Sequence, residues 1–217
     1  MKQPISVAAI ILTSIFLCSC ASTIPLTSNI NDFVMMGIKT NTNEKVDFTY
    51  SSKVQDGKVH AYTKDKAEEV SGSGYNLSES SSLKSMLNEY MSNKFTNLGP
   101  GDSTKINVSL EDFYIEQYTE ESTGAQVVTA LFGGETNYTL VAKVKVLLTI
   151  NRNGKEFSKI ITGTSEDKYV QGIGTGTSTS NLYRGNDSLE NIHAKNINKA
   201  NNKVLMLLNA YFQELGL

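Results

Sequence analysis

The segment from Tyr138 to Ile150 constrains the fold more than any other part of this chain. Its even-numbered positions are all apolar or aromatic: Tyr138, Leu140, Ala142, Val144, Val146, Leu148 and Ile150. The odd-numbered positions mix lysine and threonine with valine and leucine. A period of two predicts a β-strand with one face buried and the other partly wet. Asn153-Gly154 then predicts a hairpin, with Phe157 to Tyr169 returning as the partner strand.

Shorter patterns predict further strands. Residues 106–110 alternate, but Phe113 and Ile115 continue on the opposite parity, so we expect a β-bulge near Asp112. The segments Val46–Tyr50 and Val59–Tyr62 are also predicted strands.

Two segments near these strands lack a clear alternation. The apolar run from Phe33 to Ile38 predicts a first strand, because it is short and bounded by polar residues. Residues 64–76 are first charged and then rich in glycine and serine, which predicts a surface loop.

Two segments have the helical period of 3.6 residues. The first has serines 78–82 as candidate N-caps and Gly99-Pro100 as a stop, and its apolar face consists of Leu83, Met86, Leu87, Tyr90, Met91 and Phe95. The second begins at Asp187-Ser188-Leu189-Glu190, ends at Gly216, and has an inward face formed by Leu189, Ile192, Ile197, Ala200, Val204, Leu207, Leu208, Tyr211 and Leu215. The order of elements predicts an α+β domain over residues 32–217, with a largely antiparallel sheet and two amphipathic helices packed on one face.

The N-terminus indicates export and lipid attachment. An apolar run from Ile5 to Cys18 is too short for a transmembrane helix, which needs about 20 residues, and fits a signal peptide over residues 1–19. Leu17-Cys18-Ser19-Cys20 has the form of a bacterial lipobox, so we expect cleavage before Cys20 and a lipid on its sulfur. The alternative is an ordinary secretory signal that contains cysteines by chance.

Residue 21 is alanine and not aspartate, which is similar to the bacterial sorting signal for the outer membrane. Residues 20–31 are small and polar, so we expect a lipidated cysteine followed by a flexible tether. The chain carries two cysteines, and after cleavage only Cys20 remains, so no thiol is left for a disulfide, a nucleophile or a metal. The net charge of −2 and the absence of a basic cluster argue against a nucleic-acid partner.

The order of these elements resembles that of the YajG-type outer-membrane lipoproteins. The resemblance covers the lipobox, the segment 34–38, the helix 83–95, the strands 106–114 and 138–150, the Asn-Gly turn and the C-terminal helix. This resemblance implies a lipid-anchored protein of the outer membrane that faces the periplasm. It implies no catalytic residues. The chain departs from the family by extra residues between 40 and 78 and by a Gly/Thr/Ser-rich stretch at 171–187.

Candidate chemistry is sparse in the rest of the sequence. Gly172–Thr177 lacks the third glycine and the adjoining helix of a dinucleotide site. His60 and His193 are the only histidines, and we interpret both as ordinary boundary residues. No catalytic, cofactor or metal site is therefore predicted. The apolar residues Val127, Val128, Leu131 and Phe132 could contact a partner or a lipid, although a buried short helix or an edge strand is the simpler explanation.

Three hypotheses follow. The first is a non-enzymatic binding or assembly module in the cell envelope, anchored by its lipid and paired with an envelope protein or with itself. The second is a carrier or sensor that holds a lipid or small apolar ligand between sheet and helices. The third, and weakest, is a cell-wall hydrolase that uses His60 or His193.

Overall fold

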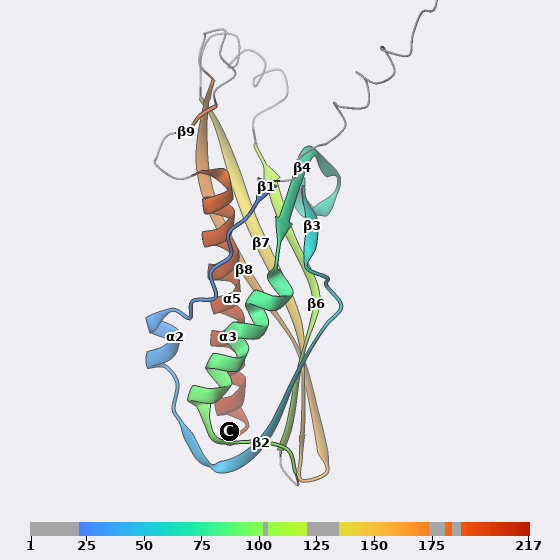
Figure 1. Ribbon diagram of the computed structural model, residues 1–217, viewed down its shortest axis with the longest axis vertical. Helices are drawn as coiled ribbons and strands as arrows, with labels where there is room; N and C mark the ends of the chain where they lie inside the picture. The colour runs from blue at the N-terminus through green and yellow to red at the C-terminus, as the bar shows by residue number, and fades with distance from the viewer. Residues whose placement is uncertain (1–21, 102–103, 121–134, 174–180, 184–187) are drawn as a thin grey trace, which may run out of the picture.

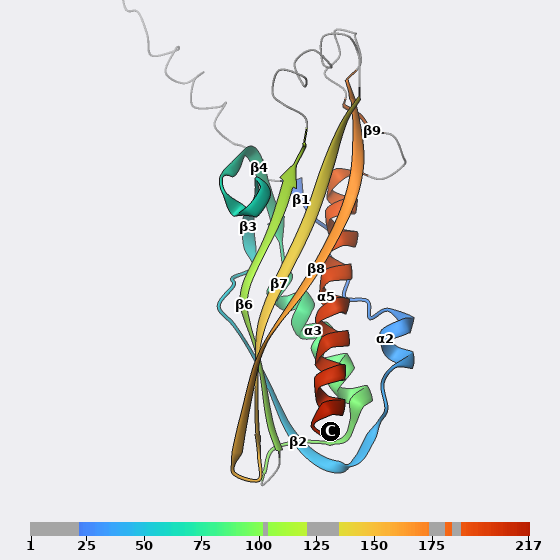
Figure 2. The same cartoon turned by 180° about the vertical axis from the view of Figure 1, so that it is seen from behind.

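Figure 1 shows the computed structural model of the chain, which describes residues 22–101, 104–120, 135–173, 181–183 and 188–217. Within these residues, nine strands form one sheet and two long helices lie on one face of it, so the predicted α+β class is confirmed. Figure 2 shows the opposite face of β6, β7 and β8, which none of the helices in the described residues covers. The sheet is mixed and not purely antiparallel.

The centre of the sheet is the antiparallel meander that the sequence predicts. It consists of β6 (Thr104–Tyr118), β7 (Glu135–Arg152) and β8 (Lys155–Ile173), to which the short β9 (Asn181–Tyr183) adds at the end of β8. Val108 pairs with Leu148, and Ile150 pairs with Phe157. The even-numbered apolar positions of β7 from Leu140 to Ile150 are all buried against the helices.

Two predicted irregularities of the meander are confirmed. The register between β6 and β7 shifts between Leu110 and Asp112, which moves Phe113 and Ile115 onto the buried face. At the hairpin, Asn153 has φ 52° and Gly154 has φ 73°. Two successive positive φ angles are what a type I′ turn requires, and asparagine and glycine tolerate them best.

Parallel pairs enter the sheet on the other side of β6. β2 (Asn41–Ser52) runs parallel to β6 and to β5 (Phe95–Leu98), and β3 (Gly57–Tyr62) also pairs in parallel with β6. A parallel pair needs a long crossover, and the connection that supplies it includes a helix over Glu79–Lys94. Local alternation cannot reveal this arrangement, because it depends on the return path of the chain.

Two sequence predictions near the start of the chain are wrong. Residues 33–38 form no strand: Asp32–Met36 is the short helix α2, whose N-cap Asn31 accepts the N–H of Phe33 at 2.8 Å. Residues 64–76 are not a loop, because the 3₁₀ turn η2 (Lys64–Lys66) is followed by β4 (Glu69–Leu77), antiparallel to β3. In β4 the alternate residues Ser73, Tyr75 and Leu77 are buried, a pattern that the glycines and serines conceal.

The two long helices are α3 (Glu79–Lys94) and α5 (Leu189–Glu214). The predicted apolar face of α3 is buried, but the helix ends at Lys94 and β5 follows before Gly99-Pro100. On α5, Ser188 is the N-cap and Ile197, Ala200, Val204 and Leu208 are buried as predicted. Leu207, however, is 36% exposed, and Phe212 takes the core position, where it stacks on Tyr90.

Helix α5 lies directly on β8. A Cβ added at Gly163 would overlap the carbonyl oxygen of Ala200 and crowd the side chain of Val204. The helix backbone can approach this closely only because Gly163 has no side chain. At this crossing, the protein itself fills the space between sheet and helix.

Candidate functional site

The sequence-predicted site residues Cys20, Val127, Val128, Leu131 and Phe132 lie outside the described residues. Their described neighbours do have positions. Ser22 begins β1 (Ser22–Thr23), and the segment 121–134 joins the end of β6 to the start of β7. Strand β1, the end of β6 and the start of β7 all lie in the part of the molecule that is uppermost in Figure 1. We call this part the anchor end.

Residues 22–31, which we call the N-terminal strap, are docked on the domain. β1 pairs in parallel with Tyr75 and Asn76 of β4, and the N–H of Ile24 donates to the carbonyl oxygen of Asn76 at 3.0 Å. Ile24 is buried. The expected flexible tether is therefore wrong for this segment, because its backbone groups have partners on the body of the protein.

A row of asparagines on α5 binds the main chain of the strap. Asn198 Nδ2 donates to the carbonyl oxygens of Thr27 at 2.8 Å and Asn29 at 3.1 Å. Asn202 Nδ2 donates to Asn29 O at 3.1 Å, and its Oδ1 accepts the N–H of Asn31 at 2.6 Å. We call Asn198, Asn202 and Asn209 the asparagine row, because positions four and seven apart share one helix face.

The third member of the row continues the pattern beyond α2. Asn209 Nδ2 donates to Gly37 O at 3.0 Å, and its Oδ1 accepts the Tyr90 hydroxyl at 3.0 Å. The amides contact backbone atoms, so they recognise an extended main chain and not particular side chains of the strap.

A groove opens at the anchor end beside η2. It has a volume of about 710 Å³, and its walls include Val70, Gln117, Tyr118 and Tyr138. The Lys64 ammonium lies 5.5 Å from the centroid of the Tyr118 ring, and Tyr138 stacks on Tyr169 at 5.1 Å. The Nε2 of Gln117 donates to the Tyr169 hydroxyl, whereas its buried Oε1 has no hydrogen-bond partner. Walls of this kind suit an apolar ligand with a polar end.

Lysines and tyrosines continue next to the groove. The Lys66 ammonium lies 4.4 Å from the centroid of the Tyr114 ring and the Lys143 ammonium lies 5.2 Å from it. Lys143 also pairs with the buried Glu116 at 3.2 Å. Cation–π contacts of this kind hold the lysine side chains against the sheet.

Glu79 is a buried acid in the first turn of α3. Its side chain is fully buried, and neither carboxylate oxygen has a hydrogen-bond partner of ordinary geometry. Burial raises the pKa of Glu79 to about 8, nearby Asp56 adds to the rise, and Asn201 beside the carboxyl offsets part of it. The amide of Asn201 is itself buried without a completed hydrogen bond. Glu79 is therefore mostly protonated at neutral pH.

The two histidines lie in different surroundings. His193, which we expected at the boundary of α5, is 1% exposed and meets Tyr75 edge-on at 5.1 Å. Burial lowers the pKa of His193 to about 4, so the ring is neutral in the core. His60 is half-buried and its Nδ1 lies 3.0 Å from Glu69 Oε1. In the described part of the chain, no hydrogen bond joins either histidine to a serine hydroxyl, as a catalytic triad would require.

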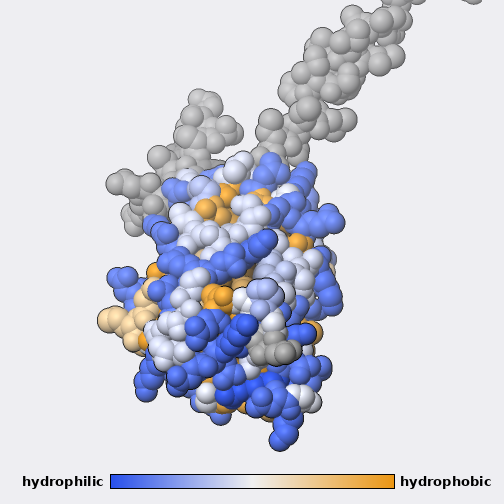
Figure 3. Space-filling model, turned by 60° about the horizontal axis from the view of Figure 1, so that its bottom comes forward, coloured by the Kyte–Doolittle hydropathy of each residue, from blue (hydrophilic) through white to orange (hydrophobic). Residues whose placement is uncertain are grey.

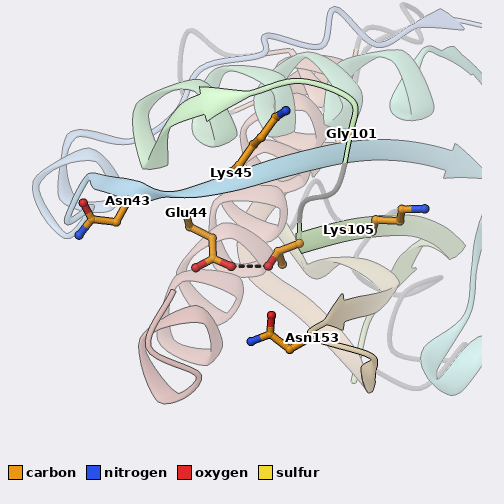
Figure 4. A pocket seen from close by; sticks show the side chains of 7 residues that line it. Asn43, Glu44, Lys45, Gly101, Lys105 and Asn153 are labelled. Atoms are coloured by element: carbon orange, nitrogen blue, oxygen red, sulfur yellow. Dashed lines mark hydrogen bonds between the residues drawn. The ribbon is translucent and has the colours of Figure 1, made fainter.

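The opposite end of the molecule carries a polar cluster that ties β2, β6, β7 and the end of α5 together, and Figure 4 shows the pocket beside it, with Glu44 in its wall. Arg152 Nε and Nη2 donate to the Glu44 carboxylate at 3.1 and 2.9 Å, and Nη1 donates to Leu215 O at 2.8 Å. The Thr104 hydroxyl also donates to Glu44. Lys45 and Lys105 line the adjoining pocket but point in different directions, so they do not converge on an anion. We interpret the cluster as a structural clamp.

Large apolar side chains are also exposed on α2. Phe33 is 66% exposed and Met36 is 79% exposed. Figure 3 shows an apolar projection on the side of the molecule where α2 lies, surrounded by polar side chains. Such a projection is typical of a contact surface.

Two kinds of site are absent from the described residues. No three His, Cys, Asp or Glu side chains there come together in a group that could hold a metal ion. Nor is any helix in the described ranges long and apolar enough to cross a membrane.

Comparisons with other proteins add little. No protein-family model matches the chain, and no curated protein matches it. One solved structure, titled "Crystal structure of uncharacterized protein", is similar with a TM-score of 0.43 at 10% identity, covering 90% of this chain and 99% of that one. A likeness at this level carries no conclusion about function.

Proposed function

We propose that this protein is a bacterial lipoprotein, anchored through Cys20 to the outer membrane and facing the periplasm, which acts as a non-enzymatic binding or assembly module of the cell envelope. The lipobox Leu17-Cys18-Ser19-Cys20 carries the proposal. β1 begins two residues after Cys20, and its pairing with β4 holds this point of the chain against the body. In this arrangement the anchor end faces the lipid headgroups.

The residues at the anchor end support this orientation. Lys64 and Lys66 are exposed, and they lie over the rings of Tyr118, Tyr62 and Tyr114. Lysine and tyrosine are favoured at membrane–water interfaces, because an aromatic ring or aliphatic stem contacts the acyl boundary while the polar group stays hydrated.

Membrane attachment is tested with two single substitutions in the full chain. Cys20→Ser removes the sulfur that carries the lipid, so the protein should move from the membrane fraction to the soluble periplasmic fraction. Cys18→Ser is the matched control, because this residue leaves with the signal peptide and its loss should not change the membrane fraction. Equal distribution of both variants would exclude attachment through Cys20.

Two features support a binding role. Residues 155–170 of β8 pair with β7, but no strand in the described residues pairs with their other edge. An open edge can accept an extended segment from another chain. The exposed Phe33 and Met36 offer a second contact. Crosslinking of the lipidated protein in its membrane should yield a defined complex or oligomer, whereas a strictly monomeric, partnerless protein would contradict this role.

The groove at the anchor end favours a second candidate function, that of a lipid or apolar-ligand carrier. Its walls combine Val70, Tyr118 and Tyr138 with polar and charged residues, and they offer more room than the crossing of α5 and β8, where the protein fills the space. Native mass spectrometry of protein extracted from cells should then show a bound mass that Tyr138→Ala reduces. A ligand-free protein would exclude this function.

A further inference from the structure

The free edge of β8 presents its main-chain groups at alternate residues. The two-residue turn Asn153-Gly154 closes on Arg152 and Lys155, which a turn of this kind joins by a hydrogen bond. Hydrogen-bonded pairs alternate along an antiparallel ladder, and β7 and β8 pair without a register shift. The odd-numbered residues of β8 therefore bond to β7, while the N–H and C=O groups of even-numbered residues from 156 to 170 face the free edge. The N–H of Lys168 fits this pattern, because it donates to its neighbour's carboxylate at 3.1 Å.

Exposed apolar side chains gather about this edge. In the described part of the chain, five large apolar side chains are exposed: Phe33, Met36, Leu98, Ile160 and Leu207. Ile160 belongs to β8 itself. Leu207 lies one turn before Tyr211 on α5, and the Lys159 ammonium of β8 lies 4.1 Å from the centroid of the Tyr211 ring. The two exposed residues of α2 lie over the same edge, so four of the five belong to one region. Such a gathering is typical of a contact surface.

Helix α2 covers part of this edge. It lies outside α5, on the side of β8, in both Figure 1 and Figure 2. A pocket of about 210 Å³ opens here, and Phe33, Met206 and Ser165 line it from α2, α5 and β8. Two amides of the asparagine row fix both ends of α2, at the N–H of Asn31 and the carbonyl oxygen of Gly37. Phe33 is thus held in place before anything binds, which lowers the ordering cost of binding.

Two lysines of α5 stand at the rim of this pocket. Lys199 pairs with Asp167 of β8 at 2.8 Å, whereas Lys203 has no ion-pair partner among the residues that the structure describes. The Ser165 hydroxyl donates to an asparagine of α5, so Ser165 points to the helix face. Directly opposed residues of neighbouring strands point to the same face. A large apolar residue opposite Ser165, with carboxylates two residues away, would therefore match the walls and the rim of the pocket.

A second copy of the chain does not fit this edge. Two β8 strands paired in antiparallel fashion would be related by a twofold axis perpendicular to the sheet, so both α5 helices would lie on one face. Helix α5 lies directly over β8, because a Cβ added at Gly163 would be 2.1 Å from the carbonyl oxygen of Ala200. Paired strands are about 4.8 Å apart, but packed helices need about 8–10 Å. The occupant is therefore an extended segment that carries no helix here.

We propose that the free edge of β8 and the pocket beside Phe33 form one site for an extended segment of a partner protein, which adds to the sheet as a strand. The main chain of the segment pairs with the even-numbered residues of β8. A large apolar side chain of the segment occupies the pocket, and a carboxylate two residues away meets Lys203. The proposal rests on the proposed binding role and specifies the chemistry of its partner.

A synthetic peptide of about nine residues, roughly 30 Å long as a strand, tests the site. It carries phenylalanine at its centre, aspartate two residues to either side, and threonine or valine elsewhere. Fluorescence anisotropy with the full protein in detergent should show saturable binding, and the peptide should slow hydrogen exchange at the N–H groups of Thr162 and Thr164. A peptide of the same composition with aspartate next to phenylalanine, and so on the opposite face, should bind about tenfold more weakly. Absence of saturable binding, or unchanged exchange at both threonines, would overturn the proposal.

Thr164 offers a matched pair of variants. Its N–H faces the free edge, so Thr164→Pro keeps the bonds between β7 and β8 but removes a donor that the added strand needs. Peptide binding should weaken about tenfold or more. Thr164→Val keeps both the N–H and the preference for a strand, so binding should stay within about twofold. Unfolding midpoints of the two variants show that the fold is kept, and equal affinities of the two would overturn the proposal.

Phe33→Ala tests the pocket without a change in the sheet. The side chain is exposed, so the fold should persist while peptide affinity falls about tenfold. Leu98→Ala removes another exposed apolar side chain, on β5, and should leave affinity within about twofold. Lys203→Gln should weaken the aspartate peptide about threefold but leave an asparagine version of the peptide unaffected. Equal effects of Phe33→Ala and Leu98→Ala, or of Lys203→Gln on both peptides, would overturn the site.

Crosslinking of the protein in its membrane separates this site from the binding role itself. Thr164→Pro should remove the defined complex that the wild type forms, and Thr164→Val should keep it. A complex that survives Thr164→Pro would overturn the site and leave the binding role intact. If the wild type formed no complex although the peptide bound, the binding role alone would be contradicted. A homodimer that Thr164→Pro dissociates would overturn the choice of occupant.

Discussion

Buried polar residues distinguish this core from a purely apolar one. Glu79 and His193 both lie in it without completed hydrogen bonds at Glu79 Oε1, Oε2 and His193 Nε2. Each is kept neutral at pH 7 by burial, since the pKa of Glu79 is raised to about 8 and that of His193 is lowered to about 4. Their effects on stability have opposite signs.

The pH dependence follows from these two shifts. The folded protein keeps the Glu79 proton between pH 4.5 and about 8, where the unfolded chain has lost it, so stability falls as pH rises through this window. His193 acts oppositely between about 4 and 6.5, where the unfolded chain binds the extra proton. The two effects on stability oppose each other up to pH 6.5. Above pH 6.5, only the decrease in stability caused by Glu79 remains.

The free energy of unfolding of the wild type should fall by about 2 kcal/mol between pH 6.5 and 9, with a slope of at most about 1.4 kcal/mol per pH unit. Glu79→Gln should remove this fall, because glutamine does not titrate. Urea unfolding of wild type and variant across this range measures the difference. Glu89→Gln, an exposed glutamate on the same helix, should leave the slope unchanged. Parallel wild-type and Glu79→Gln curves would show that Glu79 is ionised in the folded protein.

At the scale of elements, local patterns predicted β6, β7, β8, α3 and α5 because each long element presents one regular apolar face. The local patterns failed where the apolar run was short, or where small residues concealed the alternation. The run Phe33–Ile38 is too short to separate strand from helix, and glycine and serine conceal the alternation of β4. The parallel pairs of β2 and β3 with β6 depend on the crossover through α3, which no local pattern encodes.

The strap was missed for a different reason. Its own sequence reads as a linker, and the residues that dock it lie on α5. The spacing of Asn198, Asn202 and Asn209 on one helix face was visible in the sequence, but a row of amides does not say which main chain it binds. The candidate site at Cys20 could be predicted from its motif, whereas the groove beside η2 required the fold.

The close contact between α5 and β8 can be tested by a substitution at Gly163. Gly163→Ala should destabilise the protein by about 1–3 kcal/mol, because the added methyl group meets the carbonyl of Ala200 and the helix must move outward. Gly37→Ala is the control, since φ there is −78° and the new methyl group has ordinary contacts, so stability should change little. Denaturant midpoints measure both, and equal midpoints would mean that α5 does not press on β8.

The whole molecule has two unlike ends. The clamp of Arg152 and Glu44 closes the hairpin end, while β1, the groove and the lysine–tyrosine contacts lie at the anchor end. Between them runs a long sheet, in which residues 155–170 of β8 have no strand on their outer edge among the described residues. This polarity fits a module that meets the bilayer at one end and partners along its length.

The proposed function requires that the mature chain begins at a lipid-modified Cys20, two residues before β1. Mass spectrometry of the N-terminal peptide, from protein purified out of bacterial membranes, tests it most directly. The peptide should start at Cys20 and carry the added mass of a diacylglycerol on its sulfur, with further acylation of the new amino group. An unmodified Cys20, or a mature N-terminus at another residue, would contradict it.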